Sequence, residues 1–352
     1  MADPTRRWTE RPLAQLTLVR LREVVREPEA IFWIFLFPVL MTAGLGLAFR
    51  SKPEGVSKVA VLAGSRWSAE TAGRLKTNPL IEVQLLDDSA AARGLRTGKV
   101  AVVVVPDSAA VRYRFDDTRP EGVAARRLAD DALQRAAGRG DPVAVSEQVI
   151  RERGSRYIDF VVPGLLGMNL LGSGVWGIGF AVVDARRKRL LKRLIATPMP
   201  RSSYLASFIL SRISLLVVEA GLLIAFGSLV FGVPLRGSIG ALILICLLSS
   251  LAFGGLGLLI ASRPRTIEGA SGIMNLALVP MWVLSGVFFS SSRFPQAIQP
   301  FVQALPLTAV NNALRANMLE GATLAQVAPE LGIVVAWMVV TFVVALRIFR
   351  WQ

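Results

Sequence analysis

Six long apolar runs divide the chain. Each contains 18 to 28 residues with few charges. A helix rises about 1.5 Å per residue, so each run can cross a hydrocarbon core of roughly 30 Å. The pattern therefore predicts a mainly α-helical membrane protein with six transmembrane helices. The predicted spans cover residues 31–49, 158–183, 204–231, 239–261, 269–289 and 332–349.

Residues 1–30 are polar and precede the first span. Between Pro12 and Val25, Leu and Val interleave with Arg at roughly helical spacing. This pattern predicts an amphipathic helix in the cytoplasmic membrane interface, with an ordinary solvated helix as the alternative. The run at 31–49 is too long for the apolar centre of a signal peptide, so we expect an uncleaved transmembrane helix.

Residues 50–157 have a different pattern, in which short β-like runs alternate with helical or turn-rich pieces. Such alternation predicts a small α/β domain, inserted between the first and second spans on the extracytoplasmic side. The predicted strands are 56–63, 81–86, 100–105 and 111–115, and the predicted helical pieces are 68–76, 89–96 and 122–137.

Residues 158–352 contain the other five predicted spans. A cytoplasmic loop at 184–203 separates the second span from the third. Residues 290–330 are punctuated by Pro and Ser and include two short helical pieces, around 296–305 and 309–319. We expect this segment to form an extracytoplasmic helical hairpin before the sixth span.

The distribution of basic residues orients the spans. Six Lys and Arg residues fall between Arg186 and Arg193, and Arg263 and Arg265 follow the fourth span. Short loops rich in Lys and Arg remain in the cytoplasm. The expected topology therefore places both termini in the cytoplasm of a bacterial cell, with the chain as a multi-pass protein of the inner membrane.

Composition excludes several kinds of site. The net charge is +15, which in a soluble protein would suggest a nucleic-acid partner. Here the basic residues lie outside the apolar runs, so no nucleic-acid partner is predicted. The chain has no His and a single Cys, Cys246. An internal disulfide, the usual zinc sites and a Ser-His-Asp triad are therefore excluded.

Few ionisable residues fall inside the predicted spans. Glu219 lies within the third span, where a carboxylate is a functional candidate by default. Arg212 lies seven residues earlier on the same helix face, and we expect a structural pair through a neighbouring side chain rather than a proton relay. Asn169, Met274 and Asn275 are candidates to line a substrate path, with helix packing as the alternative. A stripe of small residues at Ser173, Gly177 and Ala181 predicts a close helix contact.

Several segments together resemble the membrane subunits of type-2 ABC exporters (ABC-2 permeases). They are FWIFLFPVLM from Phe32, the Leu-x-Ala-Thr-Pro turn from Leu194 to Pro198, and the stretch from Leu284-Ser285-Gly286 through Pro306-Leu307-Thr308 to Leu314-Arg315. The inserted domain matches through Gly98-Lys99-Val100-Ala101-Val102 and through the acidic turn at 115–117. The resemblance covers nearly the whole chain.

This resemblance implies a permease driven by a separate ATP-binding subunit, which would bind ATP and Mg²⁺. No cofactor is expected in this chain, which has no Walker A motif. The resemblance also implies a coupling helix after the second span that docks on the ATPase, although relatives often carry a Glu and a Gly-Thr pair in place of Arg187-Lys188-Arg189. The candidate coupling residues are Arg186, Arg187, Arg189, Leu190, Leu191, Arg193, Leu194, Ile195, Thr197 and Pro198.

The expected partners are an ABC ATP-binding subunit, a second permease chain in a homodimer or heterodimer, and the lipid bilayer. A periplasmic adaptor is a further candidate. The expected function is export of an amphiphilic or hydrophobic substrate such as a drug or lipid. Two alternatives stay open. One is a membrane-anchored assembly or structural factor that uses its extracytoplasmic domain, and the other is an ion-coupled secondary transporter.

Overall fold

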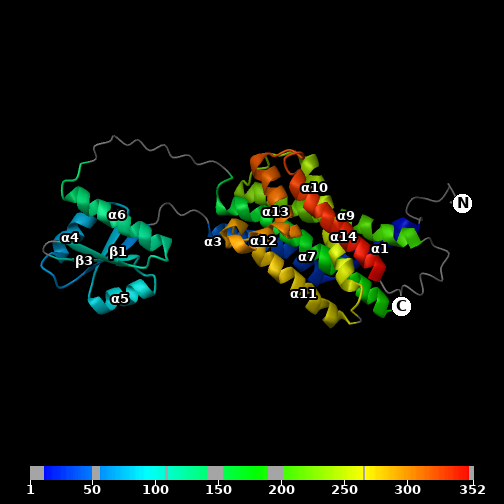
Figure 1. Ribbon diagram of the computed structural model, residues 1–352, viewed down its shortest axis with the longest axis horizontal. Coiled ribbons are helices and arrows are strands. Elements are labelled where there is room, and N and C mark those ends of the chain that lie inside the picture. Colours follow the sequence, from blue (N-terminus) through cyan, green and yellow to red (C-terminus); the bar gives the residue numbers. More distant parts are fainter. Residues whose placement is uncertain are drawn as a thin grey trace. The chain divides into compact units, whose positions relative to one another are not determined.

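The computed structural model describes residues 12–49, 56–107, 110–140, 154–188, 201–264 and 266–348. The chain divides into two compact units (Figure 1). The helical unit comprises Met1–Arg50 and Arg151–Gln352, and the α/β unit comprises Ser51–Ile150.

The described part of the helical unit contains six helices that are long and apolar enough to cross a membrane, as the apolar runs predict. The first combines α2 (Pro28–Ile31), a π-helical turn η2 (Phe32–Leu36) and α3 (Phe37–Ala48). The others are α7 (Tyr157–Arg187), α9 (Arg201–Phe231), α10 (Ile239–Ala261), α11 (Ile267–Leu284) and α14 (Ala328–Ile348).

Helix α7 lies at the centre of the helical unit and contacts most of its other spanning helices. It packs against α3, α9, α10 and α11, and most of its residues are buried (Figure 1). Its contact with α10 depends on small residues. A Cβ atom on Gly257 of α10 would lie 2.7 Å from the Val175 carbonyl oxygen, and one on Gly174 would lie 2.8 Å from Phe253. The two backbones therefore touch at a point where only glycine fits.

The predicted stripe of Ser173, Gly177 and Ala181 does not make this contact. Gly177 is exposed, and a Cβ atom placed on it would meet nothing within 4 Å. The close approach is made one turn earlier, at Gly174. A four-residue spacing of small side chains identifies a face of the helix, but it does not select between adjacent faces when glycine occurs on several of them.

Helix α11 ends at Leu284, five residues before the predicted end of the fifth span. Gly286 adopts a positive φ of 72°, which side chains disfavour. The chain then forms two 3₁₀ turns (Ser291–Arg293 and Gln296–Ile298), α12 (Gln299–Ala304), α13 (Pro306–Arg315) and a π-helical turn (Ala316–Glu320).

The predicted helical hairpin corresponds to α12 and α13, and α13 returns into the bundle. It packs against α7 and α14, and nearly all of its residues are buried. Asn311 Nδ2 donates to the Ser285 carbonyl at 2.9 Å, and Trp337 Nε1 of α14 donates to the Ala304 carbonyl at 2.9 Å. Protein therefore surrounds α13 on most sides, whereas most of α12 is exposed.

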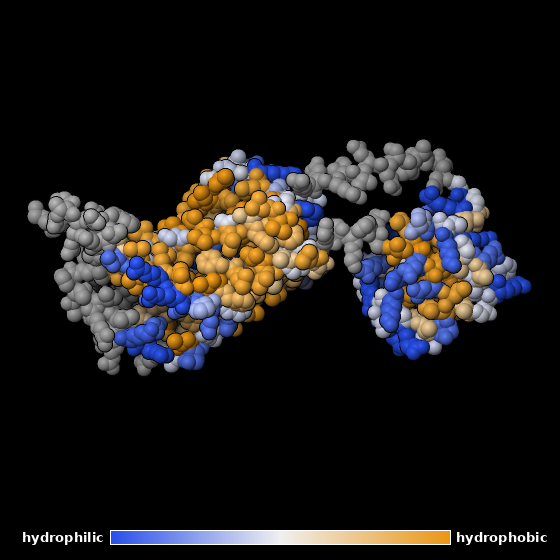
Figure 2. All heavy atoms as spheres, turned by 180° about the vertical axis from the view of Figure 1, so that it is seen from behind, coloured by the Kyte–Doolittle hydropathy of each residue, from blue (hydrophilic) through white to orange (hydrophobic). Residues whose placement is uncertain are grey.

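Helix α1 (Pro12–Arg26) packs along α9, as the N-terminal amphipathic pattern allows. Ala14 is buried in this contact, and Arg20 Nε donates to Ser207 Oγ at 3.2 Å. Val19 and Val25 remain exposed. On the face shown in Figure 2, hydrophobic residues form a broad band over the helical unit, and hydrophilic residues gather towards its ends. A band of this kind is what lipid contact requires.

The α/β unit has a four-stranded sheet in the order β2-β1-β3-β4. Its strands are β1 (Ser57–Leu62), β2 (Ile81–Leu86), β3 (Val102–Pro106) and β4 (Val111–Phe115). Strand β1 runs parallel to β2 and β3, whereas β4 is antiparallel to β3. The elements agree with the predicted strands and helices to within a few residues.

Both faces of the sheet carry helices. Helices α4 (Ser68–Leu75) and α6 (Pro120–Ala136) cover one face, over Val59, Val61 and Val104. Helix α5 (Asp88–Arg96) covers the other, over Ala60 and Val103. The Asp87 carboxylate caps α5 by accepting from the Ala90 N–H, which lowers the pKa of Asp87. Because both faces of the central strands are buried, β1 and β3 contain short continuous apolar runs, which the sequence shows clearly.

We predict that Gly257→Ala destabilises the helical unit by about 1–3 kcal/mol, since the new methyl group would meet backbone atoms of α7. Thermal unfolding of the purified protein in detergent measures this loss. Gly221→Ala is the matched control, because a Cβ atom there would meet nothing within 4 Å. Equal melting temperatures for the two variants would contradict the backbone contact.

Candidate functional site

A buried ion pair lies within α9. Arg212 Nη1 is 3.1 Å from Glu219 Oε2, and both side chains are almost fully buried. Seven residues correspond to two helical turns, or a rise of about 10 Å. Glu219 points back towards the helix N-terminus, as helical side chains do, and the long Arg212 side chain spans the remaining distance. The helix therefore brings the two charges together within one face.

Two serines complete the site. The Ser173 hydroxyl of α7 accepts from Arg212 Nη2 at 2.7 Å and donates to Glu219 Oε1 at 2.7 Å. Arg212 Nε donates to Ser250 Oγ of α10 at 2.9 Å. The pair thus joins three helices, and each nitrogen of the guanidinium has a hydrogen-bond acceptor. The sequence analysis expects Arg212 and Glu219 to pair through a neighbouring side chain. In the structure the two side chains contact each other directly, and Ser173 bridges them in addition.

This arrangement has the chemistry of a structural link. A buried charge is costly unless it is paired and its remaining donors are satisfied, and here both conditions hold. A proton relay would need a path of further titratable groups, whereas the nearest partners of Glu219 are Arg212 and Ser173. The geometry favours the interpretation of the pair as a structural link, while its contribution to transport stays a prediction.

Asn169 lies one turn before Ser173 on α7, and its side-chain amide binds a backbone carbonyl of the first span. Its Nδ2 donates to the Ile34 carbonyl at 3.0 Å. Ile34 is four residues before Pro38, and proline has no N–H to donate to that carbonyl. The Asn169 amide therefore gives this carbonyl a donor in place of the one that residue 38 lacks. Of the two roles considered for Asn169, the contact supports helix packing.

The other two candidates for the substrate path lie apart from this cluster. Met274 of α11 is fully buried against Gly179 of α7. Asn275, the next residue, is exposed on α11 between Ile273 and Leu276, which are also exposed. The structure thus brings Arg212 and Glu219 together with Ser173, places the Asn169 amide one turn away against the first span, and leaves Asn275 on the surface of the helical unit.

Arg315 forms a second polar cluster, which the sequence analysis did not single out. Its guanidinium lies 3.6 Å from the centre of the Phe160 ring, and it donates to the Phe160 carbonyl at 3.2 Å and to the Gly286 carbonyl. A Cβ atom on Gly164 of α7 would lie 2.9 Å from Arg315 Nη2. The available signal in the sequence was the position of this arginine, which ends the largely apolar stretch that begins at Leu305.

The candidate coupling residues are only partly within the described structure. Arg186 Nη1 donates to the Ala261 and Pro264 carbonyls, at 3.1 and 3.2 Å. Arg187 is exposed, and Lys188 pairs with Asp184 at 2.8 Å. The rest lie outside the described residues: Arg189, Leu190, Leu191, Arg193, Leu194, Ile195, Thr197 and Pro198.

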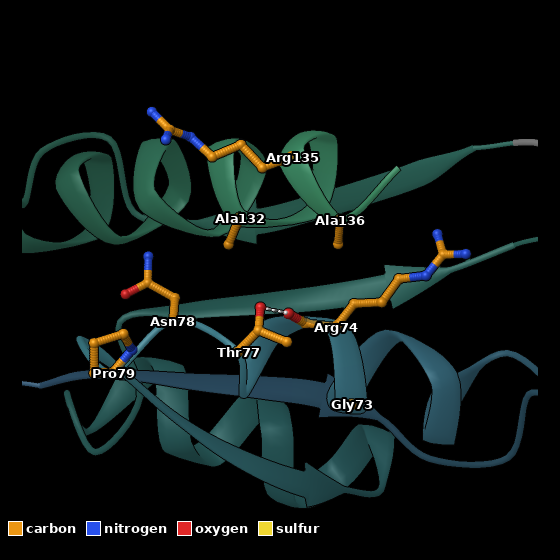
Figure 3. A pocket seen from close by; sticks show the side chains of 8 residues that line it. All are labelled: Gly73, Arg74, Thr77, Asn78, Pro79, Ala132, Arg135 and Ala136. Carbon is orange, nitrogen blue, oxygen red and sulfur yellow. Dashed lines mark hydrogen bonds between the residues drawn. The ribbon is translucent and has the colours of Figure 1, made fainter. Parts of the chain in front are cut away.

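The α/β unit contains a shallow groove of about 720 Å³ between α4 and α6. Figure 3 shows Ala132 and Ala136 facing Thr77 and Asn78 across it. Its two arginines already have acidic partners, since Arg74 binds Glu70 at 2.7 Å and Arg135 binds Asp131 at 2.8 Å. The groove therefore offers small apolar side chains and amides, with no unbalanced charge. Within the described residues, no group of three or more His, Cys, Asp or Glu side chains could hold a metal ion.

The six spans and the basic stretch between the second and third agree with a comparison against known families. Residues 28–347 match the model of a family described as ABC-2 family transporter protein. The chain belongs to the ABC-2 transporter family. The resemblance inferred from the Leu-x-Ala-Thr-Pro turn and the Leu284–Arg315 region is thereby confirmed.

Relatives of this ABC-2 permease include three bacterial transport proteins. The chain is 25% identical over 174 residues to the linearmycin resistance permease protein LnrN of Bacillus subtilis (strain 168), covering 49% of this chain and 45% of LnrN. It is 27% identical over 153 residues to the inner membrane transport permease YadH of Escherichia coli (strain K12), covering 43% of this chain and 57% of YadH. The chain thus spans about half the length of these two relatives.

A longer alignment joins the permease to YbhS of Escherichia coli (strain K12), which is named a probable multidrug ABC transporter permease. The two are 22% identical over 358 aligned positions, and the alignment covers 91% of each chain. The family likeness therefore extends over the inserted domain as well as the spans.

We predict that Asn169→Val destabilises the permease by about 1 kcal/mol, because the Ile34 carbonyl loses its donor. In a Pro38→Ala background, residue 38 regains an N–H that can reach the Ile34 carbonyl. The same Asn169→Val substitution should then cost less. A double-mutant cycle of thermal stability in detergent measures the difference, and equal costs in the two backgrounds would contradict the proposed exchange of donors.

We also predict that Arg212→Leu lowers stability by about 3–5 kcal/mol, because it leaves the Glu219 carboxylate buried without its ionic partner. The double variant Arg212→Leu/Glu219→Leu should be more stable than Arg212→Leu alone, since it removes both charges. The fraction of protein that remains monodisperse after heating measures the relative stability of these variants. A double variant less stable than either single variant would contradict this account.

Proposed function

We propose that this ABC-2 permease is the membrane-spanning subunit of an ATP-driven exporter, which moves an amphiphilic or hydrophobic substrate such as a drug or lipid out of the cytoplasm. A separate ATP-binding subunit binds ATP and Mg²⁺ and supplies the energy. The family match over residues 28–347, with six candidate spans, carries this proposal. The names of LnrN and YbhS, which refer to linearmycin resistance and multidrug transport, support a substrate of this chemistry.

The orientation follows from charge. The basic stretch from Arg186 to Arg193 and the turn at 262–266 lie at the cytoplasmic ends of their spans, because short basic loops are retained there. Both termini are then cytoplasmic in the bacterial inner membrane. The α/β unit is extracytoplasmic, where its surfaces can bind a periplasmic adaptor.

A second permease chain completes the transporter. Asn275 presents an amide on a surface of α11 that also exposes Ile273, Leu276 and Val279. An amide without a partner is unfavourable in hydrocarbon, which supports a protein neighbour or a substrate path at this surface. A dimer around a shared path provides both, whether the second chain is identical or related.

We predict that a cysteine at Ser89 of α5 reacts with a membrane-impermeant thiol reagent in intact cells, whereas a cysteine at Ser202 does not. The native Cys246 is buried and is replaced by Ser in both variants. Labelling of both cysteines after the cells are opened is the control. Labelling of Ser202→Cys in sealed cells would contradict the proposed topology.

The coupling role of residues 186–197 has its own test. Leu190, Leu191, Leu194 and Ile195 are spaced to form one apolar stripe on a helix. If the stripe is seated in the ATPase, Leu191→Asp or Leu194→Asp should release the ATP-binding subunit. Loss of a buried Leu costs about 2–5 kcal/mol, and each 1.4 kcal/mol is about tenfold in affinity. Copurification of the tagged permease with the coexpressed ATP-binding subunit measures the release.

Lys192→Gln is the matched control, because one exposed charge contributes about 1 kcal/mol or less. It should leave copurification nearly unchanged. Retention of the ATP-binding subunit by the Leu variants, together with its loss when the basic residues are neutralised, would overturn the apolar docking and favour a purely electrostatic attachment to the ATPase or to anionic lipid.

A further inference from the structure

One side chain fastens the last turn of α7 to the turn between α10 and α11. Arg186 Nη1 donates to the carbonyl of Ala261, the last residue of α10, and to the carbonyl of Pro264 in the following turn. The last carbonyls of a helix have no partner within the helix, and a cation at that end also interacts favourably with the helix dipole. One guanidinium nitrogen therefore binds the last carbonyl of α10 and one carbonyl of the turn that follows it.

Arg186 lies where the second span leads into the basic stretch. It lies in the last turn of α7, just before the stretch at 189–200 that carries most of the candidate coupling residues. A displacement of that stretch acts on this turn of α7 and on the start of α9, the two places where the stretch joins the helical unit. Because Arg186 holds the turn against the end of α10, the displacement also reaches the start of α11 at Ile267.

Further contacts hold α7 and α10 against each other along their length. Gly174 and Gly257 bring the two backbones into contact, and Arg212 of α9 binds Ser173 on α7 and Ser250 on α10. The Arg186 contact adds a tie at the helix ends. In the same turn, the Asp184 carboxylate lies 2.8 Å from Lys188 and raises the pKa of that lysine.

We propose that Arg186 is a positioning residue that makes the end of α7 and the α10–α11 turn move as one body when the ATP-binding subunit displaces the 189–200 stretch. Its partners are backbone carbonyls of its own chain, so its role differs from that of a residue seated in the ATPase. The inference rests on the proposed function, because it requires a subunit that moves this stretch.

The test measures one distance in two nucleotide states. Spin labels replace Arg187 at the end of α7 and Glu268 in the first turn of α11, both exposed, in a Cys246→Ser background. The full permease is reconstituted with its ATP-binding subunit in lipid nanodiscs. Electron paramagnetic resonance then gives the distance distribution without nucleotide and with ATP plus vanadate.

We expect the 187–268 distance to be the same in both states when Arg186 is present. In Arg186→Gln it should become nucleotide-dependent, shifting by more than the rotamer spread of the labels. Arg263→Gln is the matched control, since it removes an exposed charge from the same turn but leaves the Arg186 donor in place. Arg186→Lys, which keeps a donor but loses the reach of the guanidinium, should give an intermediate shift.

Two results would overturn the proposal: a nucleotide-dependent distance in the protein with Arg186 intact, or a nucleotide-independent distance in Arg186→Gln. Copurification of the ATP-binding subunit separates these results from failure of the proposed function. If the subunit binds the unaltered permease and the distances behave alike with and without Arg186, coupling through 189–200 survives and the positioning role of Arg186 does not.

Discussion

In a hydrocarbon core, every polar group must find its partner inside the protein, and the helical unit is organised around that constraint. Pro38 has no N–H to donate to the Ile34 carbonyl four residues earlier, and Asn169 supplies a donor from α7. Arg212 and Glu219 would each be costly alone, and Ser173 and Ser250 complete their hydrogen bonds from two neighbouring helices. Each unsatisfied group of one span thus specifies which other span must lie beside it.

The same requirement explains why α7 occupies the centre. It contributes Asn169 and Ser173 to the buried contacts, and its glycines admit the backbone of α10 at Gly174 and the Arg315 side chain at Gly164. A helix that supplies hydrogen-bond donors and also lacks side chains at its crossings can pack closely against several neighbours at once. Movement of α7 consequently affects much of the bundle, which is the property that a coupling element needs.

Sequence patterns predicted the elements well and their partners less well. The length of an apolar run predicts a membrane span, and a short β-like run predicts a strand. Local composition was therefore enough to predict the six spans and the strands of the α/β unit. The pairing of Asn169 with Ile34, and of Ser173 with Arg212, depends on residues far apart in the chain. Pro38 lies within the first span, but nothing local indicated that α7 would supply a donor to the Ile34 carbonyl. Arg315 was missed for a similar reason, since its acceptors are carbonyls at Phe160 and Gly286.

Two arginines of the helical unit bind backbone carbonyls, and this choice of partner affects how movement could pass between helices under the proposed function. A carboxylate partner can move with its own rotamer, whereas a carbonyl is fixed to its helix. Arg186 binds carbonyls of Ala261 and Pro264, and Arg315 binds carbonyls of Phe160 and Gly286. Each contact therefore joins an arginine side chain to the backbone rather than to a second flexible side chain. The Arg186 contact lies at the end of α7 that leads into the basic stretch, and the Arg315 contact lies near the opposite end. If the proposed ATP-binding subunit displaces the basic stretch, the Arg186 contact would carry the movement to the α10–α11 turn, and the Arg315 contact would oppose it at the other end of α7. Under the proposed function, α7 would then tilt together with these neighbours rather than alone.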